Sequence, residues 1–90
     1  MKPINAEKLQ DLLISYMEKY VLGIAETALD GNISMNNSLR GSLFSTAKIY
    51  SEIFEVDVNE VIGVSLKISG QIEEKLRQGS VNIIPKIEIN

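Results

Sequence analysis

The stretch that decides the fold is residues 29–34, Leu-Asp-Gly-Asn-Ile-Ser, together with the helical pattern that follows in residues 35–54. Gly31 can adopt the left-handed conformation that ends a helix, so we expect a helix to stop at Asp30. Ser34 follows the hydrophobic Ile33 and has a hydroxyl suited to capping the next helix. The sequence therefore predicts two helices joined by a tight turn.

Apolar residues recur at helical spacing before this turn and predict a first helix over residues 5–30. Asn5 is expected to cap it, with Ile4 packing onto Leu9. Gly23 weakens the helical propensity, and we expect it to mark a point of close packing. The repeating residues are Leu9, Leu12, Leu13, Tyr16, Met17, Tyr20, Ile24, Ala28 and Leu29.

The second helix, predicted over residues 34–55, has one apolar edge and one edge of small residues. Small side chains at this spacing would let another backbone approach closely, but they fit a solvated serine surface equally well. The apolar edge is Leu39, Leu43, Ala47, Tyr50 and Phe54, and the small edge is Ser38, Gly41, Ser42 and Ser45.

A third helix is predicted over residues 57–78, ending before Gly79. Asp57 and Glu60 have the spacing of a capping box, and Val56 with Val61 supplies the accompanying hydrophobic contact. Gly63 and Gly70 stand seven residues apart, so they share one side of this helix and suggest a close contact with another helix.

The last stretch changes to a two-residue period, with apolar residues at odd positions and mostly polar residues between them. Pro85 cannot donate a hydrogen bond, which restricts this segment to a sheet edge or a lone extended arm. Such an arm must lie in a groove, pair with another subunit or add to a partner's sheet. We therefore expect a helical domain over residues 1–80 and an extended arm over residues 81–90.

Composition excludes several classes of chemistry. The 90 residues include no cysteine and no histidine, which removes disulfides, thiolate nucleophiles and most zinc sites. The net charge of −3 argues against binding a phosphate backbone through bulk charge. No apolar run is long enough to span a bilayer, and no signal-peptide pattern opens the chain. We expect an intracellular, cytoplasmic, non-enzymatic protein without metal or cofactor.

Local clusters offer little chemistry. The carboxylates Glu52, Glu55, Asp57 and Glu60 could bind a metal, but capping and a solvated helix end explain them better. Arg40 and Lys48 could share one face of a DNA-reading helix, although a solvated face accounts for them more simply. The aromatic residues are interpreted as core that stacks across the hairpin, and they are Tyr16, Tyr20, Phe44, Tyr50 and Phe54.

The apolar faces and the alternating arm present more hydrophobic surface than one three-helix core uses, which is typical of protein interfaces. We expect a homo-oligomer or a subunit that covers this surface with a protein partner. The residues predicted to form the interface are Ser38, Gly41, Ser42, Ser45, Gly63, Gly70, Val81, Ile83, Ile87 and Ile89.

The central stretch resembles the helical hairpin of phage small terminase subunits, which select viral DNA for packaging. The resemblance lies in residues 28–34, with Leu39, Leu43, Ala47-Lys48 and Phe54 after the turn, about a third of the chain. It implies a non-enzymatic, ring-forming protein that binds DNA and a larger motor subunit. The residues before the hairpin contain no recognisable winged or helix-turn-helix pattern, so no DNA-binding residues are assigned.

Three functions are consistent with these observations. The first is an oligomerising adaptor or structural subunit, most concretely a packaging protein of the small-terminase kind. The second is a small monomeric inhibitor or regulator that acts through its acidic surface or its arm. The third, an enzyme using carboxylates, ranks last because the sequence contains no recognisable acid–base pair.

Overall fold

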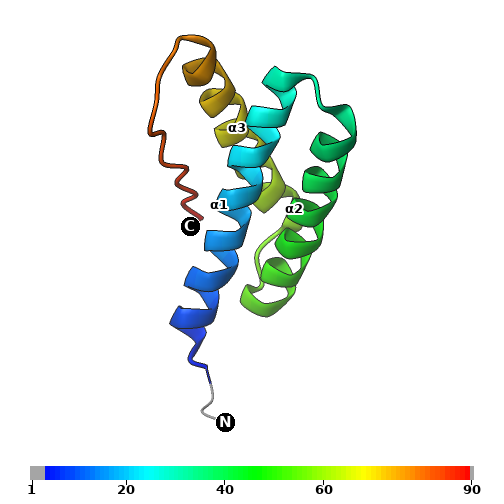
Figure 1. Ribbon diagram of the computed structural model, residues 1–90. Helices are drawn as coiled ribbons and strands as arrows, with labels where there is room; N and C mark the ends of the chain where they lie inside the picture. Colours follow the sequence, from blue (N-terminus) through cyan, green and yellow to red (C-terminus); the bar gives the residue numbers. More distant parts are fainter. Residues whose placement is uncertain (1–3, 90) are drawn as a thin grey trace.

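The structure, a computed structural model that describes residues 4–89, contains three helices followed by an arm without regular secondary structure (Figure 1). The helices are α1, Ala6–Asp30; α2, Ile33–Phe54; and α3, Val58–Arg77. The predicted all-α, three-helix fold is confirmed, and each predicted boundary lies within one residue of the observed one. Residues 4–89 contain no β-strand.

The turn between α1 and α2 forms as expected on Gly31, which has a φ of 70°. Its N–H donates to Ala28 O at 3.4 Å, and the Asn32 N–H donates to Thr27 O at 3.0 Å. These two bonds form a Schellman motif, which satisfies carbonyls that the end of a helix otherwise leaves free. Ala28 and Thr27 thus fix the direction in which the chain leaves α1.

The N-cap of α2 differs from the prediction. Asn32, not Ser34, is the capping residue, and its side chain accepts a hydrogen bond from Met35 N at 3.2 Å. The Schellman motif is complete at Asn32, so α2 begins immediately after it and Ser34 already lies in the first turn. Asparagine is as good an N-cap as serine, and the cap nearer the turn is the one that forms.

The other caps lie where the sequence places them. Asn5 accepts from Lys8 N at 2.7 Å, and Asp57 accepts from Asn59 N at 2.8 Å. The reciprocal half of the predicted capping box does not form, because no bond from the Asp57 N–H to the Glu60 carboxylate occurs within residues 4–89. Asp57 bonds the amide two residues on, which is sufficient to cap α3.

Helix α1 lies against both other helices and contacts each more extensively than α2 contacts α3. At one crossing, Gly23 of α1 lies directly against Leu39 of α2, as a close-packing glycine should. Two serines of α3, Ser65 and Ser69, are buried as well. The apolar core consists of Met17, Val21, Ile24, Ala25, Leu43, Ala47, Tyr50, Val61, Ile72 and Ile87.

The aromatic residues only partly follow the prediction. Tyr50 is buried, whereas Tyr16 and Phe44 are exposed. The aromatic contact joins Tyr50 and Phe54, with ring centroids 4.8 Å apart, and these residues stand one turn apart on α2. Tyr50 reaches α1 through its hydroxyl, which accepts from Gln10 Nε2 at 2.7 Å. The predicted stacking across the hairpin is therefore wrong: the aromatic pair of Tyr50 and Phe54 lies within one helix, and Tyr50 contacts α1 through a polar bond.

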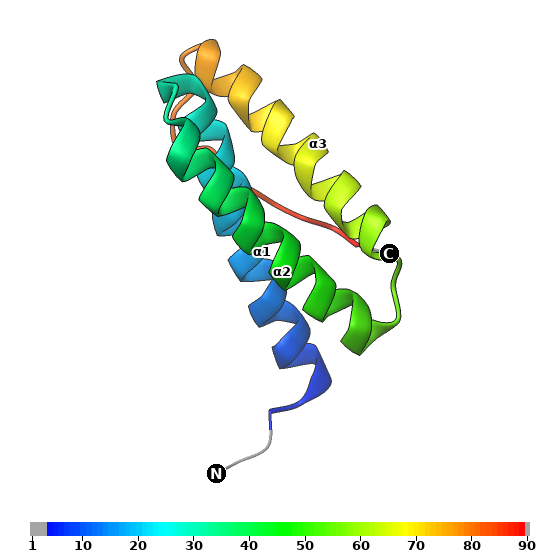
Figure 2. The ribbon, with the colours of Figure 1, turned by 90° about the vertical axis from the view of Figure 1, so that its right-hand side faces the viewer.

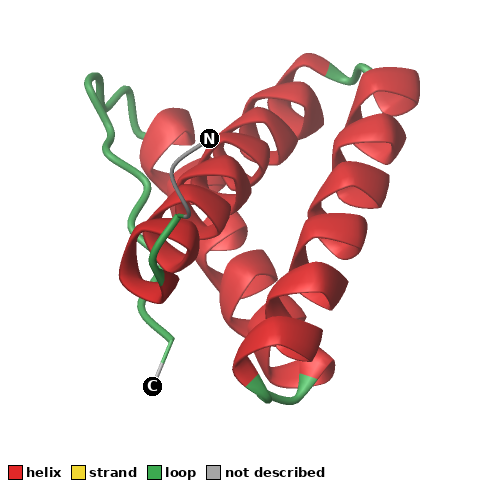
Figure 3. Cartoon of the chain, turned by 90° about the horizontal axis from the view of Figure 1, so that it is seen from below, coloured by secondary structure: helices red, strands yellow, loops and turns green. Residues whose placement is uncertain are grey.

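After α3 the chain turns at Gly79, with φ of 84°, and runs back along the helices. The side chain of Ile87 is only 4% exposed, and its N–H donates to Glu18 Oε2 of α1 at 2.8 Å. Figures 1 and 2 show this returning arm beside α1 and α3, and Figure 3 shows it on the side of the molecule away from α2. The arm thus packs on the chain's own helices.

Candidate protein interface

The exposed side of α2 carries uncharged residues at seven-residue spacing. Met35, Ser42 and Ile49 form one row, and Ser38 and Ser45 form a second row beside it. All five are exposed, with Met35 at 50% and Ile49 at 49%. We call these five residues the α2 stripe. A seven-residue repeat keeps them on one side of the helix, where they present a narrow surface with an apolar residue toward each end.

The opposite side of α2 explains why the α2 stripe is left outside. Leu43, Ala47 and Tyr50 are buried and recur at intervals of three and four residues, so they fix which side faces the core. Gly41 lies on the exposed side, and a Cβ placed there would meet nothing within 4 Å. The four small residues predicted as an interface therefore lie together on the surface, without a partner helix in this chain.

Gly63 and Gly70 also lie on an exposed side, that of α3. A Cβ on either glycine would meet nothing within 4 Å, so no helix of the described residues 4–89 packs there. Gly23 is the helical glycine at which the chain's own helices meet: a Cβ there would lie 2.8 Å from Leu39 Cδ1. The close helix contact predicted at Gly63 and Gly70 does not occur within residues 4–89.

The four arm residues predicted at the interface divide into two groups. Val81 is 78% exposed, whereas Ile87 is buried and Ile83 and Ile89 are partly buried against the core. The three isoleucines contribute to the stability of the single chain, and the buried Ile87 becomes accessible to a partner only if the arm leaves. Ile84, the exception to the alternation, is 85% exposed.

Exposed large apolar side chains occur on all three helices and on the arm. Single exposed residues of this kind are ordinary, but a concentration of them is typical of an interaction surface. Those on the helices are Leu12, Tyr16, Leu29, Ile33, Met35, Phe44, Ile49, Ile53 and Leu66.

The carboxylates after α2 form no metal site. Asp57 caps α3, and Glu55 is the C-terminal cap of α2 in the left-handed conformation, with φ of 55°. Within residues 4–89, no three acidic side chains are grouped so that they could hold a metal ion. Arg40 bonds to a neighbour on its own helix, Asn36 Oδ1, at 2.8 Å.

A polar cluster that was not predicted joins α1 to α2 near the turn. Asn36 Nδ2 donates to Ile24 O at 2.9 Å and to Thr27 Oγ1 at 3.0 Å. The sequence does contain a signal for it, because Thr27 and Asn36 are equally distant from the centre of the turn. Residues so placed in an antiparallel hairpin lie opposite one another, as Gly23 and Leu39 also do.

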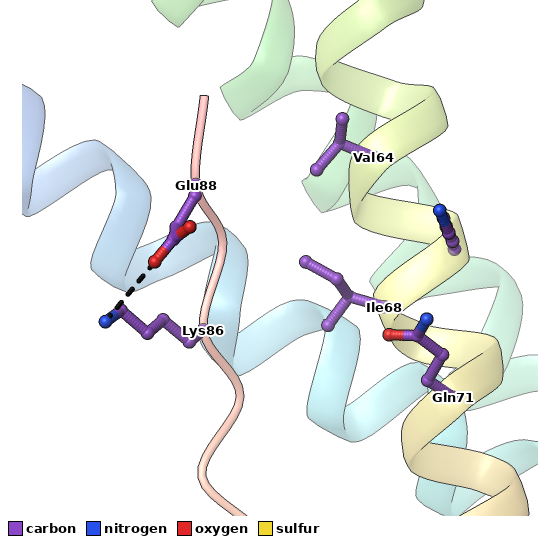
Figure 4. A pocket seen from close by; sticks show the side chains of 6 residues that line it. Val64, Ile68, Gln71, Lys86 and Glu88 are labelled. Atoms are coloured by element: carbon purple, nitrogen blue, oxygen red, sulfur yellow. Dashed lines mark ion pairs between the residues drawn. The ribbon is translucent and has the colours of Figure 1, made fainter. Parts of the chain in front are cut away.

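An open groove separates α3 from the arm, with a volume of about 290 Å³. Val64, Ile68 and Gln71 line it from α3, and Lys86 and Glu88 line it from the arm (Figure 4). Lys67 completes the lining. A second hollow of about 180 Å³ continues the groove toward Lys75 and Ile83. The sequence could not locate this groove, because the path of the arm creates it.

Comparisons with protein-family models, curated proteins and solved structures found no match to this chain. Within residues 4–89, no helix combines the length and the apolar character needed to cross a membrane.

Proposed function

We propose that this protein is a non-enzymatic subunit that assembles with copies of itself through the α2 stripe. The observation that carries the proposal is the exposure of five uncharged residues, Met35, Ser38, Ser42, Ser45 and Ile49, at seven-residue spacing on one helix. Seven-residue repeats are the pattern by which helices pack along their length, and small residues allow a short distance between axes.

The α2 stripe is complementary to itself. If two α2 helices pack antiparallel with Ser42 of one copy near Ser42 of the other, Met35 of each copy lies opposite Ile49 of its neighbour. Ser38 then lies near Ser45 in the same arrangement. A contact of this kind is isologous and closes a dimer.

A ring requires two different surfaces on each subunit. The exposed side of α3 that carries Gly63 and Gly70 is a suitable second surface, because neither glycine is covered within the chain. Packing the α2 stripe of one copy on this side of the next copy would generate a ring. The most concrete form of the proposal is therefore a packaging subunit of the small-terminase kind, supported by the resemblance of the hairpin and by its closure at Gly31.

The decisive experiment measures the native mass of the protein at micromolar concentration. We expect a mass above that of one chain, and we expect Ser42→Glu to return it to one chain with unchanged helical circular dichroism. Burying a carboxylate in the contact without a counter-charge is unfavourable. Ser15→Glu is the matched control, because Ser15 is an exposed serine on α1, and it should leave the assembly intact.

A wild-type mass equal to one chain would overturn the proposal, and so would equal effects of Ser42→Glu and Ser15→Glu. Gly70→Glu distinguishes the two assemblies: it dissociates a ring and leaves an α2–α2 dimer unchanged. Binding of double-stranded DNA that weakens with salt would support the packaging form, whereas an assembled protein without DNA binding restricts the proposal to a structural subunit.

A further inference from the structure

The last residues of the arm alternate between exposed and covered positions. Ile84, Lys86 and Glu88 are exposed, and the residues between them, Pro85 and Ile87, are covered. Lys86 Nζ lies 3.3 Å from Glu88 Oε1, so side chains two residues apart lie on the same face. Both observations are those of a two-residue period, in which successive side chains point to opposite faces.

One edge of this strand is already engaged. The Ile87 N–H donates to Glu18 Oε2 of α1, so the main-chain groups of Ile87 lie on the α1 edge. In an extended chain the N–H and C=O groups of neighbouring residues point to opposite edges. Those of Lys86 and Glu88 therefore lie on the free edge. Within residues 4–89 they form no main-chain hydrogen bond that would occupy this edge.

Proline does not interrupt the free edge. Pro85 stands two residues before Ile87 and shares its edge, the one facing α1. The N–H that proline lacks would point to the α1 edge, which no partner strand would use. Ile84, Lys86 and Glu88 all retain an N–H and a C=O for pairing on the opposite edge.

The free edge borders the groove between α3 and the arm. Val64 and Ile68 provide apolar side chains on the α3 side of the groove, and the arm forms the other wall, with the side chains of Lys86 and Glu88 pointing away from α3 (Figure 4). An unpaired strand edge beside an open apolar hollow is the arrangement by which extended peptides add to a protein.

The charge of the groove is opposite to that of the whole chain. Its α3 side contains Lys67 and Lys75 and no acidic residue, and on the arm Lys86 is paired with Glu88, although the chain carries a net charge of −3. No aromatic side chain lines either part, so the stacking platform used to bind single-stranded nucleic acid is absent from this lining. The charge and the apolar floor together favour a peptide with acidic residues.

We propose that this groove binds an extended acidic segment of a partner protein, which adds as a strand to the free edge of residues 84–88. Alternate apolar side chains of the segment pack on Val64 and Ile68, and its carboxylates pair with Lys67 and Lys75. The arm lies on the side of the molecule away from α2, so a dimer formed by two α2 stripes leaves this groove uncovered (Figure 3).

The test uses a blocked synthetic hexapeptide of alternating glutamate and valine, titrated into the ¹⁵N-labelled full chain. We expect saturable shifts of the Lys86, Glu88, Val64 and Ile68 amides, with an affinity that weakens as salt is added. Lys67→Glu should weaken binding at least tenfold. Lys19→Glu, the matched charge reversal at an exposed lysine of α1, should leave the affinity unchanged.

Two further probes test the strand pairing. The same hexapeptide methylated on alternate main-chain nitrogens cannot donate to the free edge, and we expect its binding to be lost. Removal of residues 81–90 should also abolish binding. The proposal is overturned if the unmodified peptide causes no shifts, if a lysine–valine hexapeptide binds equally well, or if binding survives the arm deletion. A single-stranded oligonucleotide that competes better than the peptide would overturn it as well.

Discussion

The four glycines inside the helices differ in what surrounds them. A Cβ on Gly23 would lie 2.8 Å from Leu39 Cδ1, whereas a Cβ on Gly41, Gly63 or Gly70 would meet nothing within 4 Å. Glycine in a helix interior costs about 1 kcal/mol relative to alanine. At Gly23 that cost is offset by the close approach of α2, and at the other three positions the single chain offers no compensation.

We therefore predict that Gly63→Ala and Gly70→Ala each raise the free energy of unfolding by about 1 kcal/mol. Gly23→Val should lower it by about 1–3 kcal/mol, because the branched side chain overpacks against Leu39. Urea denaturation at a concentration where the protein is a single chain measures all three. Equal changes at Gly23 and Gly63 would contradict the assigned packing.

Glu55 is a strained residue, since it holds the left-handed conformation at the end of α2 with φ of 55°. This conformation costs a non-glycine residue about 1–2 kcal/mol, while glycine increases the entropy of the unfolded chain. We predict that Glu55→Gly raises the stability by about 0.5–1 kcal/mol in net terms. Glu52→Gly, on the last turn of the same helix, should instead lower it, as thermal unfolding of both variants can show.

Among the elements, the helices could be predicted from the sequence because their signals are local. Gly31, Asn5 and Asp57 end or begin helices through bonds to residues within a few positions. Ser34 is wrong as the predicted N-cap of α2, because Asn32 and Ser34 are both good N-cap residues and only the completed turn decides between them. The predicted burial of Tyr16 and Phe44 is also wrong. Burial of these side chains depends on how each helix is rotated about its axis relative to the others, which the sequence does not specify.

The arm could be predicted only in part, for a physical reason. Its alternation predicts one covered face, and Ile83, Ile87 and Ile89 are covered whereas Val81 is exposed, but alternation does not say what covers them. The covering partner is α1, through Glu18 and the core around Ile87, which lie far away in the sequence. The groove beside the arm forms because the arm docks on the helices, so no local sequence pattern predicts it.

The arm gives a prediction at the scale of the element. Ile87 is 4% exposed and Ile84 is 85% exposed, although both are isoleucines of the same segment. Ile87→Ala should release the arm, at a cost of up to about 2–5 kcal/mol. Ile84→Ala should change the stability by less than about 0.5 kcal/mol. Limited proteolysis with a protease that cleaves after Lys86 would distinguish the two variants. Only Ile87→Ala should be cleaved rapidly there, because only this variant releases the arm.

At the scale of the whole molecule, the arm lies on the side of the helices away from α2 (Figure 3). In an α2–α2 dimer the two sites share no residue and are expected to act additively, whereas in a ring Lys67 of the groove stands between Gly63 and Gly70 of the second assembly surface. For the dimer, we predict that Ser42→Glu leaves the affinity for the acidic hexapeptide unchanged, and that saturating peptide raises the native mass of the assembly only by the mass of the bound peptide. A loss of peptide binding in Ser42→Glu would show instead that assembly builds the groove.

The bond between Glu18 and Ile87 spans 69 residues of sequence, and this separation has a consequence for how the chain folds. The hairpin of α1 and α2 closes through neighbouring residues, whereas the arm can dock only after α1 and α3 have formed its binding site. We therefore expect the arm to dock in the last step of folding and to detach in the first step of local opening. In native-state hydrogen exchange, the Ile87 amide should exchange through a local opening with a lower free energy than the amides of Val21 or Ala47.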